Sequence, residues 1–185
     1  MATGKKSRKI YPTDPGQRDE NVEEPVSSYA FAAVVCGPTS ADVSLLRPME
    51  LLGIVPSFKP KKASEHDYIS VIREGIYKES MDRLMKITGL TSAEMASLVH
   101  TSDRTLRRYQ DRHKLNPEQS ERLIELARLY ARGEEVFEDM ALFREWMGMP
   151  AVALGNQPPK SFLDTSIGID MLLKLLLSIE HGTYS

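Results

Sequence analysis

The chain has 185 residues, of which 41% are hydrophobic and 27% are charged, so it can form one compact domain or two small ones. Its formal net charge of −2 argues against indiscriminate binding to nucleic acid, and its single cysteine, Cys36, excludes an internal disulfide framework. The basic N-terminus lacks the apolar core of a signal peptide, and no apolar run is long enough to span a bilayer. We therefore expect a cytoplasmic protein that does not bind membranes.

The first part of the chain carries few helical signals. Residues 1–28 mix charged residues with proline and glycine and have almost no apolar spacing, which predicts a flexible arm. We expect residues 29–63 to form an N-terminal helical segment of unclear role. Within it, SYAFAAVVC and RPMELLGIV predict two short helices that are separated by prolines.

Residues 64–132 carry regular helical signals and predict a helical domain, and the motif at 94–110 described below indicates that it serves DNA binding and dimerisation. TSAE at 91–94 is a capping box that opens a short helix, and Ser102 can cap the next one. Asn116 followed by Pro117 opens a long helix. Glycines predict the ends of several helices, and we expect helices at about 64–75, 78–89, 91–99, 102–112 and 116–133.

The stretch EMASLVHTSDRTLRRYQ, residues 94–110, has the spacing of a helix-turn-helix. Its tight turn falls at His100–Thr101, and the small Ala96 lies where the two helices would cross. At 100° per residue, Arg104, Arg107 and Arg108 share one face of the second helix, opposite an anchored apolar face. The alternative is a solvated basic face of an ordinary helical bundle.

Basic residues dominate the second helix and the segment after it, with five basic and two acidic residues from Asp103 to Lys114. Arginine offers paired donors to guanine edges and also binds phosphates. One such unit makes few contacts, so specific operator binding requires a homodimer over two half-sites. The candidate DNA contacts are Ser102, Arg104, Thr105, Arg107, Arg108, Arg112 and Lys114.

Residues 133–185 predict a second, small helical domain. It contains a helix at about 137–147, the loop ALGNQPPKSFLD, and a final helix at 165–181. The final helix is apolar over most of its circumference. One apolar side can meet Phe143, Trp146 and Met147 of the preceding helix, and the other needs a second subunit or a partner protein. Glu180 breaks local rules, because it projects toward the apolar side at a helix C-terminus.

Together, the two domains resemble the Xre/MbcA/ParS-type antitoxins of RES–Xre toxin–antitoxin systems. The helix-turn-helix resembles an Xre, phage-repressor-like unit. The C-terminal stretch resembles the family's toxin-binding domain in its ALG turn at 153–155, the segment 159–164, the small Gly168 and the ending IEHG followed by an aromatic residue. The resemblance covers about residues 68–185 and implies an all-α fold, namely an Xre-like helix-turn-helix bundle followed by a small helical toxin-binding domain.

The resemblance also implies a function. Such antitoxins neutralise a RES-domain toxin that consumes NAD, bind their own operator and repress the operon, and their C-terminal end lies against the toxin's active-site entrance. We hypothesise that Tyr184 and Ser185, with the terminal carboxylate, act as a plug there. The candidate toxin contacts are Leu163, Asp164, Glu180, His181, Gly182, Thr183, Tyr184 and Ser185.

Two alternatives to an antitoxin stay open at this point: a plain helix-turn-helix regulator without a toxin partner, and a localisation factor that has lost its toxin. An enzyme is not supported, because the four histidines are scattered and the sequence has no catalytic triad order, glycine-rich phosphate loop or metal-ligand spacing. We therefore expect no cofactor and no metal. The absence of sustained period-2 alternation predicts that the fold is all-α.

Overall fold

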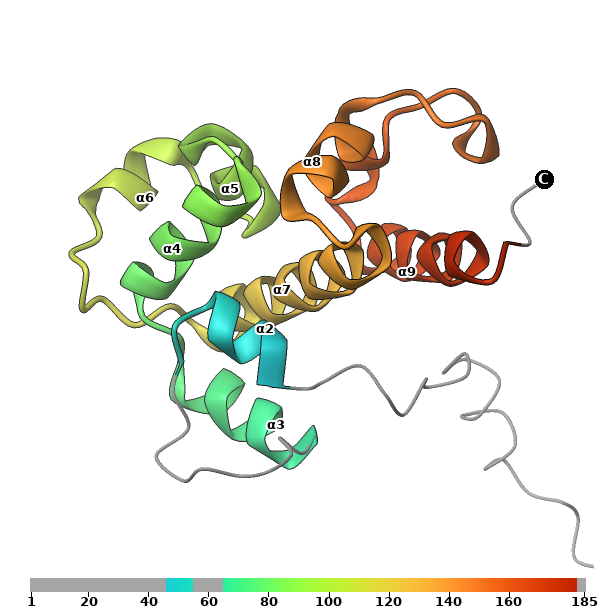
Figure 1. Ribbon diagram of the computed structural model, residues 1–185. Helices are drawn as coiled ribbons and strands as arrows, with labels where there is room; N and C mark the ends of the chain where they lie inside the picture. Colours follow the sequence, from blue (N-terminus) through green and yellow to red (C-terminus); the bar gives the residue numbers. More distant parts are fainter. Residues whose placement is uncertain (1–45, 55–64, 183–185) are drawn as a thin grey trace, which may run out of the picture. The chain divides into compact units, whose positions relative to one another are not determined.

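The computed structural model describes residues 46–54 and 65–182 (Figure 1). Apart from two isolated bridges, these residues form no β-structure, and the predicted all-α fold is confirmed. The helices are α2 (Leu46–Leu51), α3 (Glu65–Glu74), α4 (Lys78–Thr88), α5 (Ser92–Leu98), α6 (Asp103–Arg108), α7 (Pro117–Phe137), α8 (Met140–Gly148) and α9 (Ser166–Glu180), with short 3-10 turns η1 (Val152–Leu154) and η2 (Pro159–Phe162). The predictions that lie outside the described residues are the arm at 1–28, the helix in SYAFAAVVC, the start of the next helix at residue 64 and the contacts Thr183, Tyr184 and Ser185.

Helix ends follow the capping signals in the sequence. The Thr91 hydroxyl accepts a hydrogen bond from the Glu94 amide at 3.3 Å, and the Glu94 carboxylate accepts one from the Thr91 amide at 2.8 Å. Asn116 and Gln119 form the same reciprocal pair at the start of α7. Since these partners lie within four residues of each other, they satisfy the first free amides of each helix without help from the rest of the fold.

Helix α7 is the centre of the fold. It contacts α2, α3, α4, α8 and α9, and Figure 1 shows its long ribbon running between the other helices. Leu123, Leu126 and Leu129 on its buried faces are completely enclosed. Helices of both predicted domains therefore pack on this one helix.

The prediction that Gly133 ends this helix is wrong. The helix continues to Phe137 and ends where Glu138 adopts a left-handed conformation with φ of 58°. A Cβ atom on Gly133 would lie 2.3 Å from the Phe143 ring, so the glycine allows α8 to approach closely. The sequence signal is genuine, but it marks a helix crossing instead of a helix end.

The sequence predicted that one side of α9 packs on α8. In the structure, α9 packs mainly along α7. The aromatic face of α8 is directed at α7, where Phe143 meets Tyr130 edge-to-face with ring centroids 5.3 Å apart. Trp146 stacks on Phe143 at 5.7 Å. The ring cluster therefore joins α8 to α7, and α9 buries its own leucines against another part of α7.

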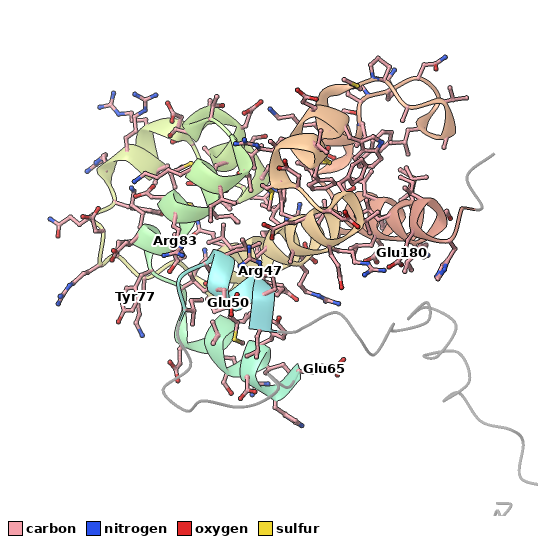
Figure 2. All side chains as sticks on the ribbon, in the orientation of Figure 1. Arg47, Glu50, Glu65, Tyr77, Arg83 and Glu180 are labelled. Carbon is pink, nitrogen blue, oxygen red and sulfur yellow. The ribbon has the colours of Figure 1, made fainter. Side chains whose placement is uncertain are left out.

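Helix α2 gives the end of the N-terminal segment a structural role. Met49 and Leu52 are buried in the core, where α2 contacts α4 and α7. Arg47 donates from Nε and Nη2 to the Glu134 carboxylate at 2.8–2.9 Å and from Nη1 to Glu50 at 3.2 Å. Figure 2 shows Arg47 and Glu50 next to each other on α2. Residues 46–54 thus belong to the same folded unit as the helix-turn-helix.

Candidate DNA and toxin interfaces

The predicted helix-turn-helix is present in α5, the turn at His100 and α6. His100 has a positive φ of 54°, and the Thr101 amide donates to the Ala96 carbonyl oxygen at 2.8 Å. Ala96 is 2% exposed and Leu106 is 1% exposed, so both side chains close the crossing of the two helices. The side of α6 opposite Leu106 is left to solvent, as a recognition helix requires.

Three arginines extend from the outer side of α6. Arg104, Arg107 and Arg108 are all exposed, and in Figure 2 several nitrogen-tipped side chains point outward from this region. Arg107 Nε donates to Asp103 Oδ2 at 2.9 Å, whereas Arg104 and Arg108 make no ion pair with any residue that the structure describes. The bond from Arg107, together with one from Ser92, lowers the pKa of the Asp103 carboxyl. Arg104 and Arg108 are therefore the arginines available for a ligand without breaking an internal contact.

Ser102 and Thr105 lie at the start of α6. The Ser102 hydroxyl accepts a hydrogen bond from the Thr105 amide at 3.1 Å, and the two hydroxyl oxygens are 2.7 Å apart. Ser102 is the N-cap residue, as predicted. Both side chains thus stabilise the helix start, and their role as DNA contacts remains a prediction.

Helix α6 is shorter than predicted, so Arg112 and Lys114 do not extend its face. At Tyr109 the backbone leaves the helical conformation and becomes extended, with ψ of 133°. The Tyr109 ring stacks on His113 with ring centroids 3.8 Å apart. The segment then binds the start of α4, where the amide of Lys78 donates to the His113 carbonyl oxygen at 2.9 Å. These tertiary contacts replace the last helical turn.

Arg112 and Lys114 differ in their surroundings. Lys114 Nζ donates to the Glu74 carbonyl oxygen at 3.1 Å and lies 5.4 Å from the centre of the Tyr77 ring. Arg112 is exposed on the loop that follows α6. Arg112 is therefore free to reach a phosphate, whereas Lys114 already holds the loop against α3 and α4.

The candidate toxin contacts separate into buried and exposed residues. The Leu163 side chain is 0% exposed in the core beneath η2, so it packs in the fold, and its role as a toxin contact stays a prediction. Its carbonyl oxygen accepts a hydrogen bond from Arg122 Nη2 at 2.6 Å. Asp164, His181 and Gly182 are exposed and remain candidates.

Glu180 has a structural partner that the sequence analysis missed. Arg132 of α7 is buried, and its Nη2 donates to the Glu180 carboxylate while its Nη1 donates to Glu135 at 2.7 Å. Figure 2 shows Glu180 on α9. The Glu180 carboxylate thus helps to neutralise a buried guanidinium, and removing it would leave Glu135 as the remaining carboxylate paired with Arg132 among the described residues.

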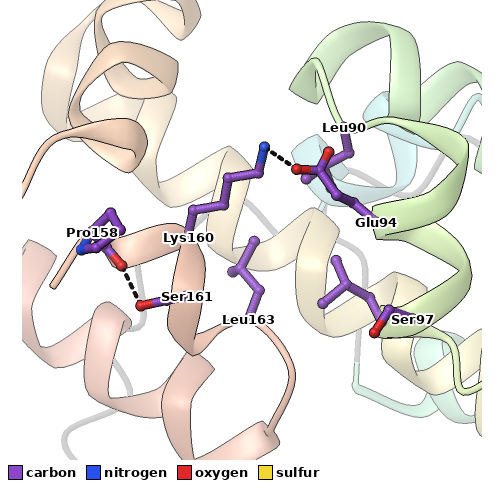
Figure 3. A pocket seen from close by; sticks show the side chains of 8 residues that line it. Leu90, Glu94, Ser97, Pro158, Lys160, Ser161 and Leu163 are labelled. Carbon is purple, nitrogen blue, oxygen red and sulfur yellow. Dashed lines mark hydrogen bonds and ion pairs between the residues drawn. The ribbon is translucent and has the colours of Figure 1, made fainter.

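A pocket of about 360 Å³ lies between the helix-turn-helix and the C-terminal helices. Lys160 of η2 contacts Glu94 of α5 across it, with Nζ and Oε1 2.6 Å apart (Figure 3). The hydrogen bond from Lys160, followed by that from the Thr91 amide, lowers the pKa of Glu94 to about 2. The remaining lining residues are Leu90, Ser97, Leu98, Pro158, Ser161 and Leu163.

The Glu94–Lys160 pair predicts a dependence of stability on pH. Because the folded protein lowers the pKa of Glu94 from 4.5 to about 2, the ionised carboxylate stabilises the fold above about pH 4.5, and this contribution disappears as the pH falls toward 2. Solvent screens the pair, since the Glu94 side chain is 39% exposed, so the contribution is about 1 kcal/mol.

Urea unfolding of the wild type and Glu94→Gln from pH 7 to 2.5 measures this contribution. We expect a constant difference in unfolding free energy above pH 5 that shrinks at lower pH. The exposed Glu145, which has no ion pair among the described residues, provides the control Glu145→Gln, with a difference near zero throughout. A Glu94→Gln difference that stays constant down to pH 2.5 would contradict the ion-pair explanation.

No group of three or more metal-ligating side chains occurs among residues 46–54 and 65–182. In the same ranges, no helix has both the length and the apolar character needed to cross a bilayer.

Comparison with known proteins separates the same two regions. Residues 67–128 match the family described as the antitoxin Xre-like helix-turn-helix domain. Residues 132–182 match the antitoxin Xre/MbcA/ParS C-terminal toxin-binding domain. The chain is also similar to the Prs ADP-ribosylating antitoxin of Sphingobium sp. (strain YBL2), with 25% identity over 67% of this chain and 84% of that protein. Helix α7 spans the short interval between the two matched regions.

Proposed function

Because the chain belongs to the antitoxins that join an Xre-like helix-turn-helix to an Xre/MbcA/ParS C-terminal toxin-binding domain, we propose that it neutralises an NAD-consuming RES-domain toxin and represses its own operon. As an antitoxin it is a binding protein and not an enzyme. The toxin-binding match at residues 132–182 favours an antitoxin over a plain regulator without a toxin. The observation that carries the proposal is that one helix, α7, joins both modules.

The proposed repressor activity rests on the exposed arginines of α6. A single helix-turn-helix reaches few base pairs, so we propose a homodimer that places two copies of α6 in successive major grooves. Arg104 and Arg108 would contact bases or phosphates, with Arg112 on the neighbouring backbone. Operator binding also implies that the protein acts in the cytoplasm, where the DNA is.

The proposed toxin can consume NAD by one of two reactions, which an experiment can distinguish. The resemblance to antitoxins of RES-domain toxins favours a toxin that degrades NAD. The relative's name refers to ADP-ribosylation of Prs, a reaction in which NAD donates ADP-ribose to a protein. Both reactions consume NAD, but only the second leaves ADP-ribose on a protein target.

Co-expression with the adjacent reading frame tests the proposal. We expect the two proteins to co-purify, and we expect the toxin alone to deplete cellular NAD while the antitoxin restores it. Detection of ADP-ribose on cellular proteins distinguishes transfer from degradation. If the pair does not co-purify and NAD is unchanged, the toxin-neutralising function is excluded.

Removal of residues 182–185 is predicted to weaken toxin neutralisation by at least about tenfold, because Tyr184 supplies a rigid aromatic anchor of the kind that dominates interfaces. Dimerisation and operator shifts are expected to stay unchanged, since the helix-turn-helix is not altered. Growth rescue at graded antitoxin levels measures the loss. Tyr184→Ala should reproduce most of it and Ser185→Ala little. Full protection by the truncated protein would show that the toxin is bound elsewhere.

A further inference from the structure

The turn between α8 and η2, residues 149–157, is ordered by its own backbone. The Ala151 amide donates to the Gln157 carbonyl oxygen at 3.2 Å, and the Asn156 amide donates to the Ala151 carbonyl oxygen at 3.0 Å. Leu154 anchors the turn in the core. In Figure 1 this segment extends away from α8. The turn is therefore a fixed feature of the surface.

This ordered turn carries two of the strongly exposed apolar side chains of the module, which also include Ile167 at the start of α9. Val152 is 81% exposed and Met149 is 56% exposed. No residue from 148 to 159 is charged. Scattered exposed apolar residues are ordinary, but these two lie on one hydrogen-bonded turn and form a small apolar protrusion. We refer to residues 149–157 as the 149–157 turn.

The conformation of the turn is set before any partner binds. Gly155 and Asn156 both have positive φ, of 64° and 61°, and their amides donate to carbonyl oxygens within the turn. A partner that covers Val152 thus gains apolar burial without having to order a loop. Preorganisation of this kind raises affinity, because little conformational entropy remains to be lost.

Charge indicates what kind of partner fits. Residues 132–182 contain eight acidic and four basic residues, whereas the segment from Asp103 to Lys114 has an excess of basic residues. A second copy of the chain would bring two acidic modules together, and DNA would meet like charge. A protein surface with an apolar recess and basic flanks is complementary to this module.

We infer that the 149–157 turn is a docking element for the cognate toxin and that Val152 and Met149 enter an apolar recess bordered by basic residues. This inference rests on the proposed toxin-neutralising function, and it places a contact site in a different stretch of the chain from the 182–185 tail. The tail and the turn would then hold the toxin at two points.

The test uses the full chain and the toxin encoded beside it, with affinity measured by titration calorimetry on a catalytically inactive toxin. Val152→Glu is expected to weaken binding at least tenfold, because it places a charge in the apolar recess. The matched control is Ile69→Glu on α3, an exposed aliphatic residue outside the toxin-binding match, which should retain wild-type affinity. Unchanged operator shifts and circular dichroism verify that both variants are folded.

The outcomes separate this inference from the proposed function. If the wild type binds the toxin and Val152→Glu binds it equally well, the docking role is overturned and the antitoxin function stands. If Val152→Glu alters only the dimerisation of the chain, the turn is an interface between copies and the toxin assignment is wrong. An equal loss of toxin affinity in Ile69→Glu would also overturn the docking role of the 149–157 turn. If the wild type fails to bind the toxin, both the inference and the proposed function fail.

Discussion

Replacing Arg104 and Arg108 together with alanine is expected to weaken operator binding by at least about thirtyfold while toxin binding stays unchanged. Both side chains are exposed on α6 and are free of ion pairs with the described residues, so they can give all their donors to DNA. A bidentate arginine contact to a base contributes about 1–3 kcal/mol, and losses at separate positions add. Gel shifts on the promoter of the operon measure the effect.

Arg107 offers a graded comparison within the same helix. Because Asp103 already holds its guanidinium, Arg107→Ala is expected to cost less operator affinity than either of the other two changes. Arg73 on α3, which is exposed and outside the helix-turn-helix, serves as the control for lost charge alone. If the double variant and Arg73→Ala shift the operator equally, α6 does not read DNA.

The second large effect is expected for Arg122→Leu, which should lower the free energy of unfolding by about 3 kcal/mol or more. Arg122 is 5% exposed and lies where the two modules meet. Its Nε donates to the Leu98 carbonyl oxygen of α5 at 3.3 Å, its Nη2 to the Leu163 carbonyl oxygen at 2.6 Å, and its Nη1 to Ser166 at 3.2 Å. It also pairs with Glu125.

Leucine in this position would leave two buried carbonyl oxygens without donors and Glu125 without its cation, and broken buried networks of this kind cost about 3–5 kcal/mol. Urea denaturation provides the measurement. Arg128→Leu, six residues later on the exposed side of α7, is the matched control and should change stability by less than about 0.5 kcal/mol. Equal effects of the two substitutions would show that the Arg122 contacts do not stabilise the fold.

Both predictions concern residues that the sequence analysis treated very differently. The outward arginines of α6 were found because a six-residue helix still obeys the 100° rotation, and Leu106 fixes which side is buried. Arg122 went unnoticed, although it shares a helical spacing with the buried Leu126 and Leu129. A charged residue in an apolar stripe is a usable signal, but it does not identify the partner.

The sequence by itself determined which segments form helices, several of their N-caps and the turn of the helix-turn-helix. These features depend on contacts within about four residues, as between Thr91 and Glu94 or Asn116 and Gln119, so periodicity and capping chemistry are sufficient to predict them. The same local rules predicted an apolar final helix at 165–181, which the structure has at Ser166–Glu180.

Only the tertiary structure decided which side chains serve the fold and which remain available to partners. Glu180 pairs with Arg132, 48 residues away, Lys160 reaches Glu94, and Leu163 turns into the core, none of which follows from helical periodicity. Gly133 suggested a helix end because the sequence around a glycine looks the same whether the helix ends there or an aromatic ring packs closely against it. Local sequence sets backbone preference, whereas burial and ion pairing depend on residues that only folding brings together.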